Sequence, residues 1–204
     1  AIDSANNASK FSEALTVKTL GDNVAPSVPG NLKVVSKTSS TVHLSWTAST
    51  DNYKVAKYEI YRDNALVGSS ETNSFTDKGL TQSITYAYKI RAIDTAGNTS
   101  AFTPVIEVET EQSIVTIYYK GFKTPHIHYK KSTGLWTTSP GVAMPNAEIS
   151  GYFKITIPLG YMDELIACFN DGKGIWDSNG GANYRFKEGV WTFENGNIKP
   201  GPPK

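Results

Sequence analysis

The segment 169–184, FNDGKGIWDSNGGANY, combines a tryptophan with side chains that hydrogen-bond in turns. Its sixteen residues include four Gly, three Asn and two Asp, a composition typical of loops. Trp176 stands in the middle of this polar segment, where an indole has little core to fill. An exposed indole can stack on the C–H face of a sugar ring while amides and carboxylates bond its hydroxyl groups. The segment therefore predicts a site for sugar recognition.

A second tryptophan, Trp136, lies in another polar loop, KSTGLWTTSP. His128 precedes it by eight residues. Because side chains alternate along a strand, His126 and Lys130 share the face of His128 and are weaker candidates for ligand contact. We expect Trp136 and Trp176 to contact the ligand directly, and His128 is either a third contact or a satisfied surface histidine. Two indoles set at an angle would follow a curved α-glucan, whereas a flat β-glucan suits coplanar rings.

Polar side chains around the central tryptophan are expected to hydrogen-bond the ligand, with Asn183 and Asp177 as first choices and Asn179 next. The same residue types also stabilise turns through bonds to the backbone, so this alternative stays open for each of them. Trp191, in the alternating run VWTF, is predicted to be structural. Cys168, in the apolar run LIACF, is predicted to be a buried thiol.

No set of residues predicts catalysis. Asp171, Asp177 and Glu188 could supply two carboxylates for glycoside hydrolysis, but short loops on small sandwiches leave little room for a deep cleft. We therefore expect no catalytic residue, no cofactor and no metal at the sugar site. A structural calcium ion in the oxygen-rich stretch DGKGIWDSNGG is an alternative, although that stretch lacks the closing Glu of a helix–loop–helix calcium loop.

Charge and composition exclude several classes of partner. The 204 residues carry 20 basic and 19 acidic side chains without a basic run, which argues against nucleic acid or an anionic membrane. No stretch approaches the ~18 consecutive apolar residues of a membrane span. The single cysteine rules out a disulfide within the chain. Abundant Tyr, Gly and Pro favour an all-β protein with many turns.

An internal repeat indicates the domain boundaries. Residues 1–19 align with residues 92–110 without a gap, and nine of the nineteen positions are identical. A period near ninety residues fits tandem β-sandwiches. We therefore expect residues 1–20 to be the last strands of a preceding repeat, poorly packed without their own domain, in a fragment of a longer protein. Residues 21–30, GDNVAPSVPG, are a predicted linker.

Short runs of β-branched and aromatic residues between turn signals predict two further units. Seven runs predict a first sandwich over residues 31–111, and six predict a second over residues 112–194. The polar tail 195–204, NGNIKPGPPK, is predicted to be a linker. The expected fold is all-β, with two tandem antiparallel β-sandwiches.

The first sandwich resembles a bacterial fibronectin type III domain over about residues 24–110. The motifs that carry this resemblance are Pro29 with Leu32, Leu44-Ser45-Trp46, Tyr58-x-Ile60-Tyr61-Arg62, Leu80 with Tyr86, Arg91-Ala92-Ile93-Asp94 and Gly97-Asn98-x-Ser100. The resemblance implies that Trp46 is a buried core residue and that Tyr86 is the corner tyrosine. No Arg-Gly-Asp tripeptide occurs, which disfavours integrin-type adhesion.

The second sandwich resembles a starch-binding module of carbohydrate-binding module family 25. The matching segments are 115–120 (VTIYYK), 126–129 (HIHY), 136–137 (WT), 140–141 (PG), Met144, 151–152 (GY), 155–157 (ITI), 167–172 (ACFNDG), 176–179 (WDSN) and 183–184 (NY). The resemblance implies that His128, Trp136 and Trp176 form a ligand platform and that the ligand is an α-1,4-glucan. It also implies attachment to an amylase, in which fibronectin type III units act as spacers.

These features predict a non-catalytic fragment of a secreted, extracellular bacterial enzyme of the α-amylase type. Its expected partners are starch, amylose and malto-oligosaccharides, together with a covalently attached catalytic domain. We expect a monomer whose second sandwich tethers the enzyme to its polysaccharide while the first sandwich acts as a spacer. Two alternatives stay open: a module for chitin or β-glucan, and an adhesion or spacer fragment that binds no sugar.

Overall fold

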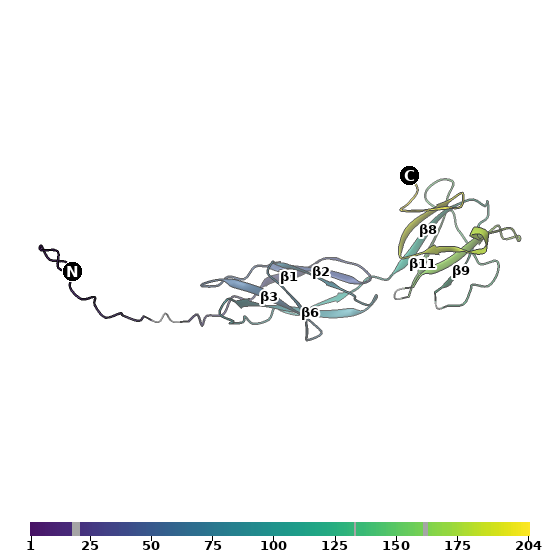
Figure 1. Cartoon of the computed structure of the whole chain (residues 1–204). Helices are drawn as coiled ribbons and strands as arrows, with labels where there is room; N and C mark the ends of the chain where they lie inside the picture. The colour runs from purple at the N-terminus through teal and green to yellow at the C-terminus, as the bar shows by residue number, and fades with distance from the viewer. Residues whose placement is uncertain (18–20, 133, 161–162) are drawn as a thin grey trace.

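The computed structural model describes residues 1–17, 21–132, 134–160 and 163–204. Within these residues the secondary structure consists of sixteen β-strands and one short 3-10 helix. Two sandwiches lie end to end, and the N-terminal segment trails away from the first of them (Figure 1). The predicted all-β fold with two tandem sandwiches is confirmed. In this part of the chain, no helix has the length and apolar character needed to cross a membrane.

The first sandwich packs a three-stranded sheet against a four-stranded sheet. The first sheet has the order β1-β2-β5, formed by Gly30–Lys37, Thr41–Thr47 and Ser74–Lys78. The second has the order β4-β3-β6-β7, formed by Ala65–Ser70, Val55–Arg62, Thr85–Asp94 and Ile106–Glu109. Along β2 the side chains of Val42, Leu44 and Trp46 are buried and alternate with more exposed ones, as expected for a strand with one face on the core.

Trp46 and Tyr86 occupy the positions implied by the resemblance to a fibronectin type III domain. Trp46 is buried and meets the ring of Tyr58 edge-on, with 5.3 Å between ring centroids. The Tyr86 hydroxyl accepts the Thr81 N–H at 2.9 Å, which ties the strand to the corner that precedes it. Both predictions are confirmed.

The second sandwich also has two sheets. One has the order β11-β8-β15-β16, formed by Phe153–Pro158, Ile114–Lys120, Gly189–Glu194 and Asn197–Pro200. The other has the order β10-β9-β12-β13, formed by Val142–Ala143, His126–Lys131, Leu165–Asn170 and Trp176–Asp177. Strand β14, Tyr184–Phe186, also pairs with β12, and the 3-10 helix Asn179–Gly181 precedes it.

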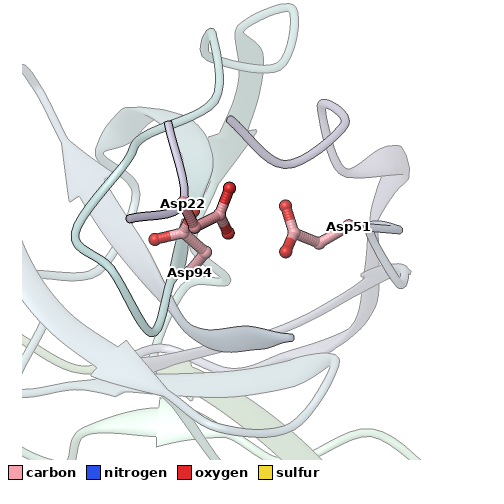
Figure 2. Close-up of side chains that lie close together, drawn as sticks. All are labelled: Asp22, Asp51 and Asp94. Carbon is pink, nitrogen blue, oxygen red and sulfur yellow. The ribbon is translucent and has the colours of Figure 1, made fainter. Parts of the chain in front are cut away.

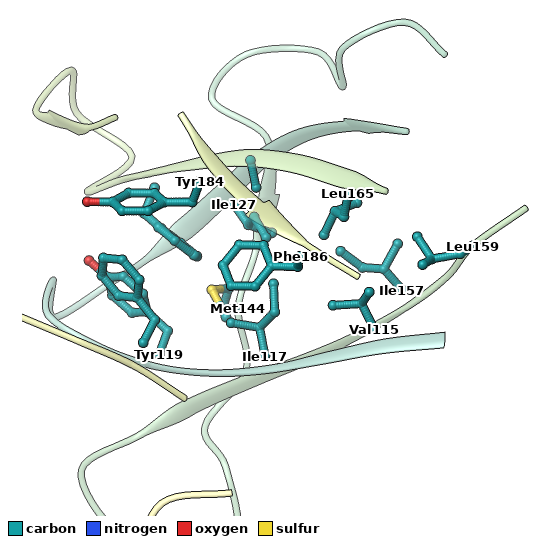
Figure 3. Packing of buried hydrophobic residues seen from close by; sticks show 13 residues of the cluster. Val115, Ile117, Tyr119, Ile127, Met144, Ile157, Leu159, Leu165, Tyr184 and Phe186 are labelled. Carbon is teal, nitrogen blue, oxygen red and sulfur yellow. The ribbon is translucent and has the colours of Figure 1, made fainter. Parts of the chain in front are cut away.

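The core of the second sandwich is rich in aromatic rings (Figure 3). Tyr119 of β8 stacks on Phe169 of β12 and on Phe193 of β15, with centroid distances of 4.4 and 5.2 Å. Ile127 of β9 enters the same core and is fully buried. Because β9 and β12 send these residues inward, their alternate residues form an outer face, and that face carries the candidate site.

Two features of the second sandwich differ from the predictions. Residues 197–200 form β16, so the prediction that 195–204 is a linker is wrong there. Asn195 and Gly196, with φ of 52° and 74°, make a two-residue turn that folds β16 back on β15. Strand β15 pairs with β8 in parallel, so the sandwich is not purely antiparallel. A parallel pair needs a long connection, which the residues between the two strands supply.

Within residues 1–17, residues 2–8 form a turn that matches the one after β6. Ile2 bridges to Ala8, and Asp3 Oδ1 accepts the N–H groups of Ala5 and Asn7 at 2.9 and 2.8 Å. Asp94 accepts the corresponding groups of its own turn, two and four residues on, in the same way. The described part of this segment contains no strand, and its large apolar side chains are exposed, as expected for a poorly packed piece. Its origin in a preceding repeat stays a prediction, and residues 18–20 lie outside the described residues.

Direct hydrogen bonds join the two sandwiches. The Gln82 side-chain amide donates to Leu159 O at 3.0 Å and accepts the Ser113 N–H at 2.5 Å. The Ser39 hydroxyl donates to the Glu188 carboxylate at 2.8 Å. The first sandwich therefore holds the second directly, as well as through the connecting residues 110–113.

Candidate binding site

The floor of the candidate site is the outer face of β9 and β12. His126, His128 and Lys130 point to this face because Ile127 and Tyr129 pack toward the core. In the register of the sheet, His128 lies opposite Cys168 of β12. Cys168 is buried, as predicted, and burial raises the pKa of its thiol, so this cysteine is a structural part of the floor.

A turn after β9 brings Trp136 back over this face. The Gly134 N–H donates to Lys131 O at 2.9 Å, and the Thr137 N–H donates to Tyr129 O at 2.8 Å. Trp136 therefore lies beside His128, with 4.9 Å between ring centroids and 15° between ring planes. The Lys130 ammonium is 5.8 Å from the centre of the indole, within range of a cation–π contact.

Trp176 reaches the same place from a hairpin between β12 and β13. Asp171 Oδ1 accepts the N–H groups of Lys173 and Ile175 at 2.8 and 3.0 Å, which shapes the turn. Gly172 has a φ of 76°, and a β-carbon there would meet the His126 ring at 2.8 Å. Trp176 pairs with Asn170 and so lies on a two-residue strand in the middle of the predicted loop.

The rings of His128, Trp136 and Trp176, here called the ring platform, are brought together by the fold. The His128 and Trp176 centroids are 5.5 Å apart, with 74° between the ring planes. Because His128 is nearly parallel to Trp136, the two indoles are steeply inclined to one another. Trp136 is 37% exposed and Trp176 is 42% exposed, so both indoles keep surface free for a ligand.

One buried asparagine fixes the two loops that carry the indoles. Asn170 is 1% exposed. Its side-chain amide donates to Pro140 O at 2.6 Å and accepts the Gly172 N–H at 2.8 Å. The first bond holds the loop after Trp136, and the second holds the turn before Trp176. Sequence reasoning placed Asn170 among polar residues of a turn and missed this role, because nothing local distinguishes a buried amide from an exposed one.

Thr137 holds the imidazole of the platform. Its hydroxyl lies 3.0 Å from His128 Nδ1 and accepts the Tyr129 N–H at 3.1 Å. Since that hydroxyl already accepts one proton, it can donate its own to Nδ1, which leaves Nε2 as the N–H donor. Burial lowers the pKa of His128 below its ordinary value of 6.5, which favours the neutral ring near pH 7. The sequence did not single out Thr137.

The polar residues predicted beside Trp176 bond mainly to their own loop. Asp177 Oδ1 accepts the Tyr184 hydroxyl at 2.6 Å, and the Asn179 side chain donates to Asn183 O at 3.4 Å. Asn183 has a φ of 60°, a conformation that asparagine tolerates in turns. These contacts agree with the turn-stabilising alternative. Ligand contact by Asp177, Asn179 and Asn183 stays a prediction.

Two further predictions concern His126 and Trp191. His126 Nδ1 lies 3.2 Å from Thr124 O, so this ring is held at the edge of the face, and its contact with a ligand stays a prediction. Trp191 packs against the core, and its indole N–H donates to Lys187 O at 2.8 Å, so its predicted structural role is confirmed.

Each exposed indole follows an exposed aliphatic residue that the sequence reasoning missed. Leu135 is 94% exposed and Ile175 is 63% exposed. Both could have been predicted from the sequence, because each is a large aliphatic residue directly before a tryptophan in a polar loop. Both place an exposed apolar side chain next in the chain to a platform indole.

Comparison with known proteins assigns the two sandwiches to families. Residues 27–109 match the model of the fibronectin type III domain, and residues 111–200 match that of the carbohydrate binding domain (family 25). One solved structure is a family 25 domain from a Bacillus halodurans amylase in complex with maltotetraose. Its sequence is 46% identical to this chain, and the match covers 45% of this chain and 100% of the solved domain, with a TM-score of 0.43. The second sandwich, residues 111–200, therefore belongs to carbohydrate-binding family 25.

The chain matches longer relatives over a small part of their length. An α-amylase of Niallia circulans is 48% identical over 190 residues, which cover 92% of this chain and 15% of the relative. A β-amylase of the same organism is 51% identical over 96 residues, which cover 44% of this chain and 17% of the relative. The two matched domains are a carbohydrate-binding domain and a fibronectin type III domain, which confirms the prediction that this fragment is non-catalytic.

Proposed function

We propose that the family 25 domain binds starch, amylose and malto-oligosaccharides through the ring platform. The steep angle between the indoles of Trp136 and Trp176 carries this proposal. A chain of α-1,4-linked glucose curves, so successive rings turn their apolar faces in different directions and can meet inclined indoles in turn. A flat β-glucan would present its faces to coplanar rings. The relative that holds maltotetraose supports the same class of ligand.

The chemistry of the platform matches this ligand. Each indole can stack on one glucose ring, a contact that contributes about 1–2 kcal/mol by analogy with other aromatic contacts. His128 Nε2 and the Lys130 ammonium can donate hydrogen bonds to hydroxyl groups at the ring edges. Because the platform is small and open, we expect dissociation constants between about 1 µM and 1 mM.

In the whole protein this domain would act as a tether. We infer that the parent is a secreted, extracellular bacterial amylolytic enzyme of the α-amylase type and that the fibronectin type III domain spaces its domains. Holding a covalently attached catalytic domain at the polysaccharide raises the local concentration of substrate without chemistry in this chain. The chain would do this as a monomer, because one platform per chain suffices for tethering.

The test is titration of maltoheptaose into the chain, followed by tryptophan fluorescence and calorimetry. We expect a saturable response in the wild type and its loss in Trp176→Ala. Tyr53→Ala is the matched control, because Tyr53 is an aromatic residue with 79% exposure in the other domain. That variant should bind like the wild type.

A pull-down on insoluble starch, chitin and cellulose completes the test. Retention on starch alone, lost in Trp176→Ala, would support the proposal. Retention on chitin or cellulose with none on starch would overturn the α-glucan assignment. Starch binding that persists unchanged in Trp176→Ala would show that the sugar binds elsewhere.

A further inference from the structure

Three aspartates from separate segments meet where the chain enters the first sandwich (Figure 2). Asp22 lies before β1, Asp51 lies between β2 and β3, and Asp94 is the last residue of β6. One carboxylate oxygen of each lies within 4.8 Å of the other two. Asp94 is only 2% exposed, so this cluster is built into the end of the domain.

The surrounding hydrogen bonds leave two buried carboxylate oxygens without partners. Asp22 Oδ1 accepts the Val24 N–H and the Asn52 amide at 3.0 and 3.1 Å, and Asp51 Oδ2 accepts two backbone N–H groups at 2.9 Å. The second oxygens, Asp22 Oδ2 and Asp51 Oδ1, are buried and have no hydrogen-bond partner among the described residues. Buried polar atoms without a partner are rare and costly in folded proteins.

The negative charges of the three aspartates also favour a bound cation. Three carboxylates at this distance repel one another, and partial burial weakens the screening by water. In residues 1–17, 21–132, 134–160 and 163–204, none of the ion pairs includes an aspartate of this cluster. A cation from solution would balance this charge.

The donor set selects the kind of cation. All three ligands are carboxylate oxygens, which hard cations prefer, whereas zinc favours nitrogen and sulfur. Calcium binds oxygens at about 2.3–2.6 Å, so ligands on opposite sides of the ion are roughly 5 Å apart. A mutual separation within 4.8 Å lets all three oxygens reach one calcium ion. We propose that Asp22, Asp51 and Asp94 form a calcium site.

The site would fasten the segment that precedes the sandwich. Asp22 belongs to residues 21–29, ahead of the first strand, while the other two ligands belong to the domain itself. Asn98, in the turn after Asp94, already donates to Asp22 O at 3.3 Å. A bound ion adds three strong contacts at this joint, so calcium stabilises the domain and fixes the direction in which the preceding chain leaves it.

The test uses the full chain after removal of calcium with EDTA and dialysis. Calorimetric titration with CaCl₂ should show one ion bound per chain. In scanning calorimetry, 5 mM CaCl₂ should raise the midpoint of the first-sandwich transition by about 5–10 °C and leave the other transition unchanged. The core variant Ile60→Val identifies the first-sandwich transition, because Ile60 is fully buried there.

Asp22→Asn and Asp51→Asn should each lose most of the calcium-dependent shift while remaining folded. Asp63→Asn is the matched control: Asp63 also accepts a backbone N–H, from Ala87 at 2.9 Å, but lies outside the cluster. It should keep the full shift. A wild-type chain with the same midpoint in EDTA and in calcium would overturn the site. So would a full shift in Asp51→Asn, or an equal shift with magnesium.

Discussion

The imidazole of His128 lies parallel to the indole of Trp136, with 4.9 Å between the two centroids. His128 therefore supports one indole and, through its edge contact at 5.5 Å, also limits the position of the other. The histidine acts as the spacer that fixes the angle between the tryptophans. Its protonation state should then affect sugar binding in a way that the tryptophans alone would not.

Sugar affinity should depend on pH through His128. Burial lowers the pKa of this ring, and a bound sugar would bury it further, so the neutral form is the form that binds. We expect constant affinity above pH 6.5 and a several-fold loss as the pH falls from there through the lowered pKa. Calorimetric titration of maltoheptaose between pH 4.5 and 8 measures this. His128→Gln should bind more weakly and without pH dependence; an unchanged profile in that variant would assign the effect to another group.

Thr137 should act as a positioning residue for that histidine. Thr137→Val keeps the shape but removes the hydroxyl that holds His128 Nδ1 and accepts the Tyr129 N–H. Affinity should fall about three- to tenfold, the effect of one hydrogen bond. Thr137→Ser restores the hydroxyl and should restore binding. The pH profile of Thr137→Val should also shift, because the partner of Nδ1 is lost; equal affinity in the Val and Ser variants would contradict this role.

The exposed aliphatic residues next to the indoles should contribute to binding without contributing to stability. Ile175→Ala and Leu135→Ala each remove apolar surface beside the ring platform, and we expect a two- to fivefold loss of affinity, about 0.5–1 kcal/mol. Leu66→Ala is the matched control, since Leu66 is 54% exposed in the first sandwich. Melting temperatures and calorimetric affinities measure both effects. Unchanged affinity in both platform variants would limit the contact to the aromatic rings.

Replacing Asn170 should lower the stability of the second sandwich, which carries the candidate site. Asn170→Ala leaves Pro140 O and the Gly172 N–H without their partner in a buried place. We expect the second sandwich to lose about 2–4 kcal/mol, measured as a lower transition midpoint in scanning calorimetry. Lys173→Gln, an exposed change in the same turn, should stay within about 0.5 kcal/mol of the wild type. An Asn170→Ala midpoint equal to the control would show that water replaces both bonds.

Much of the fold follows from local sequence patterns. Alternation placed Val42, Leu44 and Trp46 on a core-facing strand, and the resemblance to a fibronectin type III domain placed Tyr86 at the corner. The Asn195–Gly196 turn was also readable, but its proline-rich surroundings suggested a linker instead. The parallel pairing of β8 and β15 leaves no mark in either strand, because it depends on the path of the chain between them.

The candidate site was predictable only in its aromatic part. Trp136 and Trp176 stood out because indoles are unusual in polar loops, and the fold brings both to His128. The buried amide of Asn170 was hidden in a turn-rich composition. The aspartate cluster of the first sandwich was equally hidden, because its members are 29 and 43 residues apart and form no local motif.

The hydrogen bonds of Gln82 also restrict rotation of one sandwich relative to the other. Because Gln82 bonds to both Leu159 O and the Ser113 N–H, a rotation of the first sandwich turns the second with it. Any domain joined to the first sandwich would therefore move together with the ring platform.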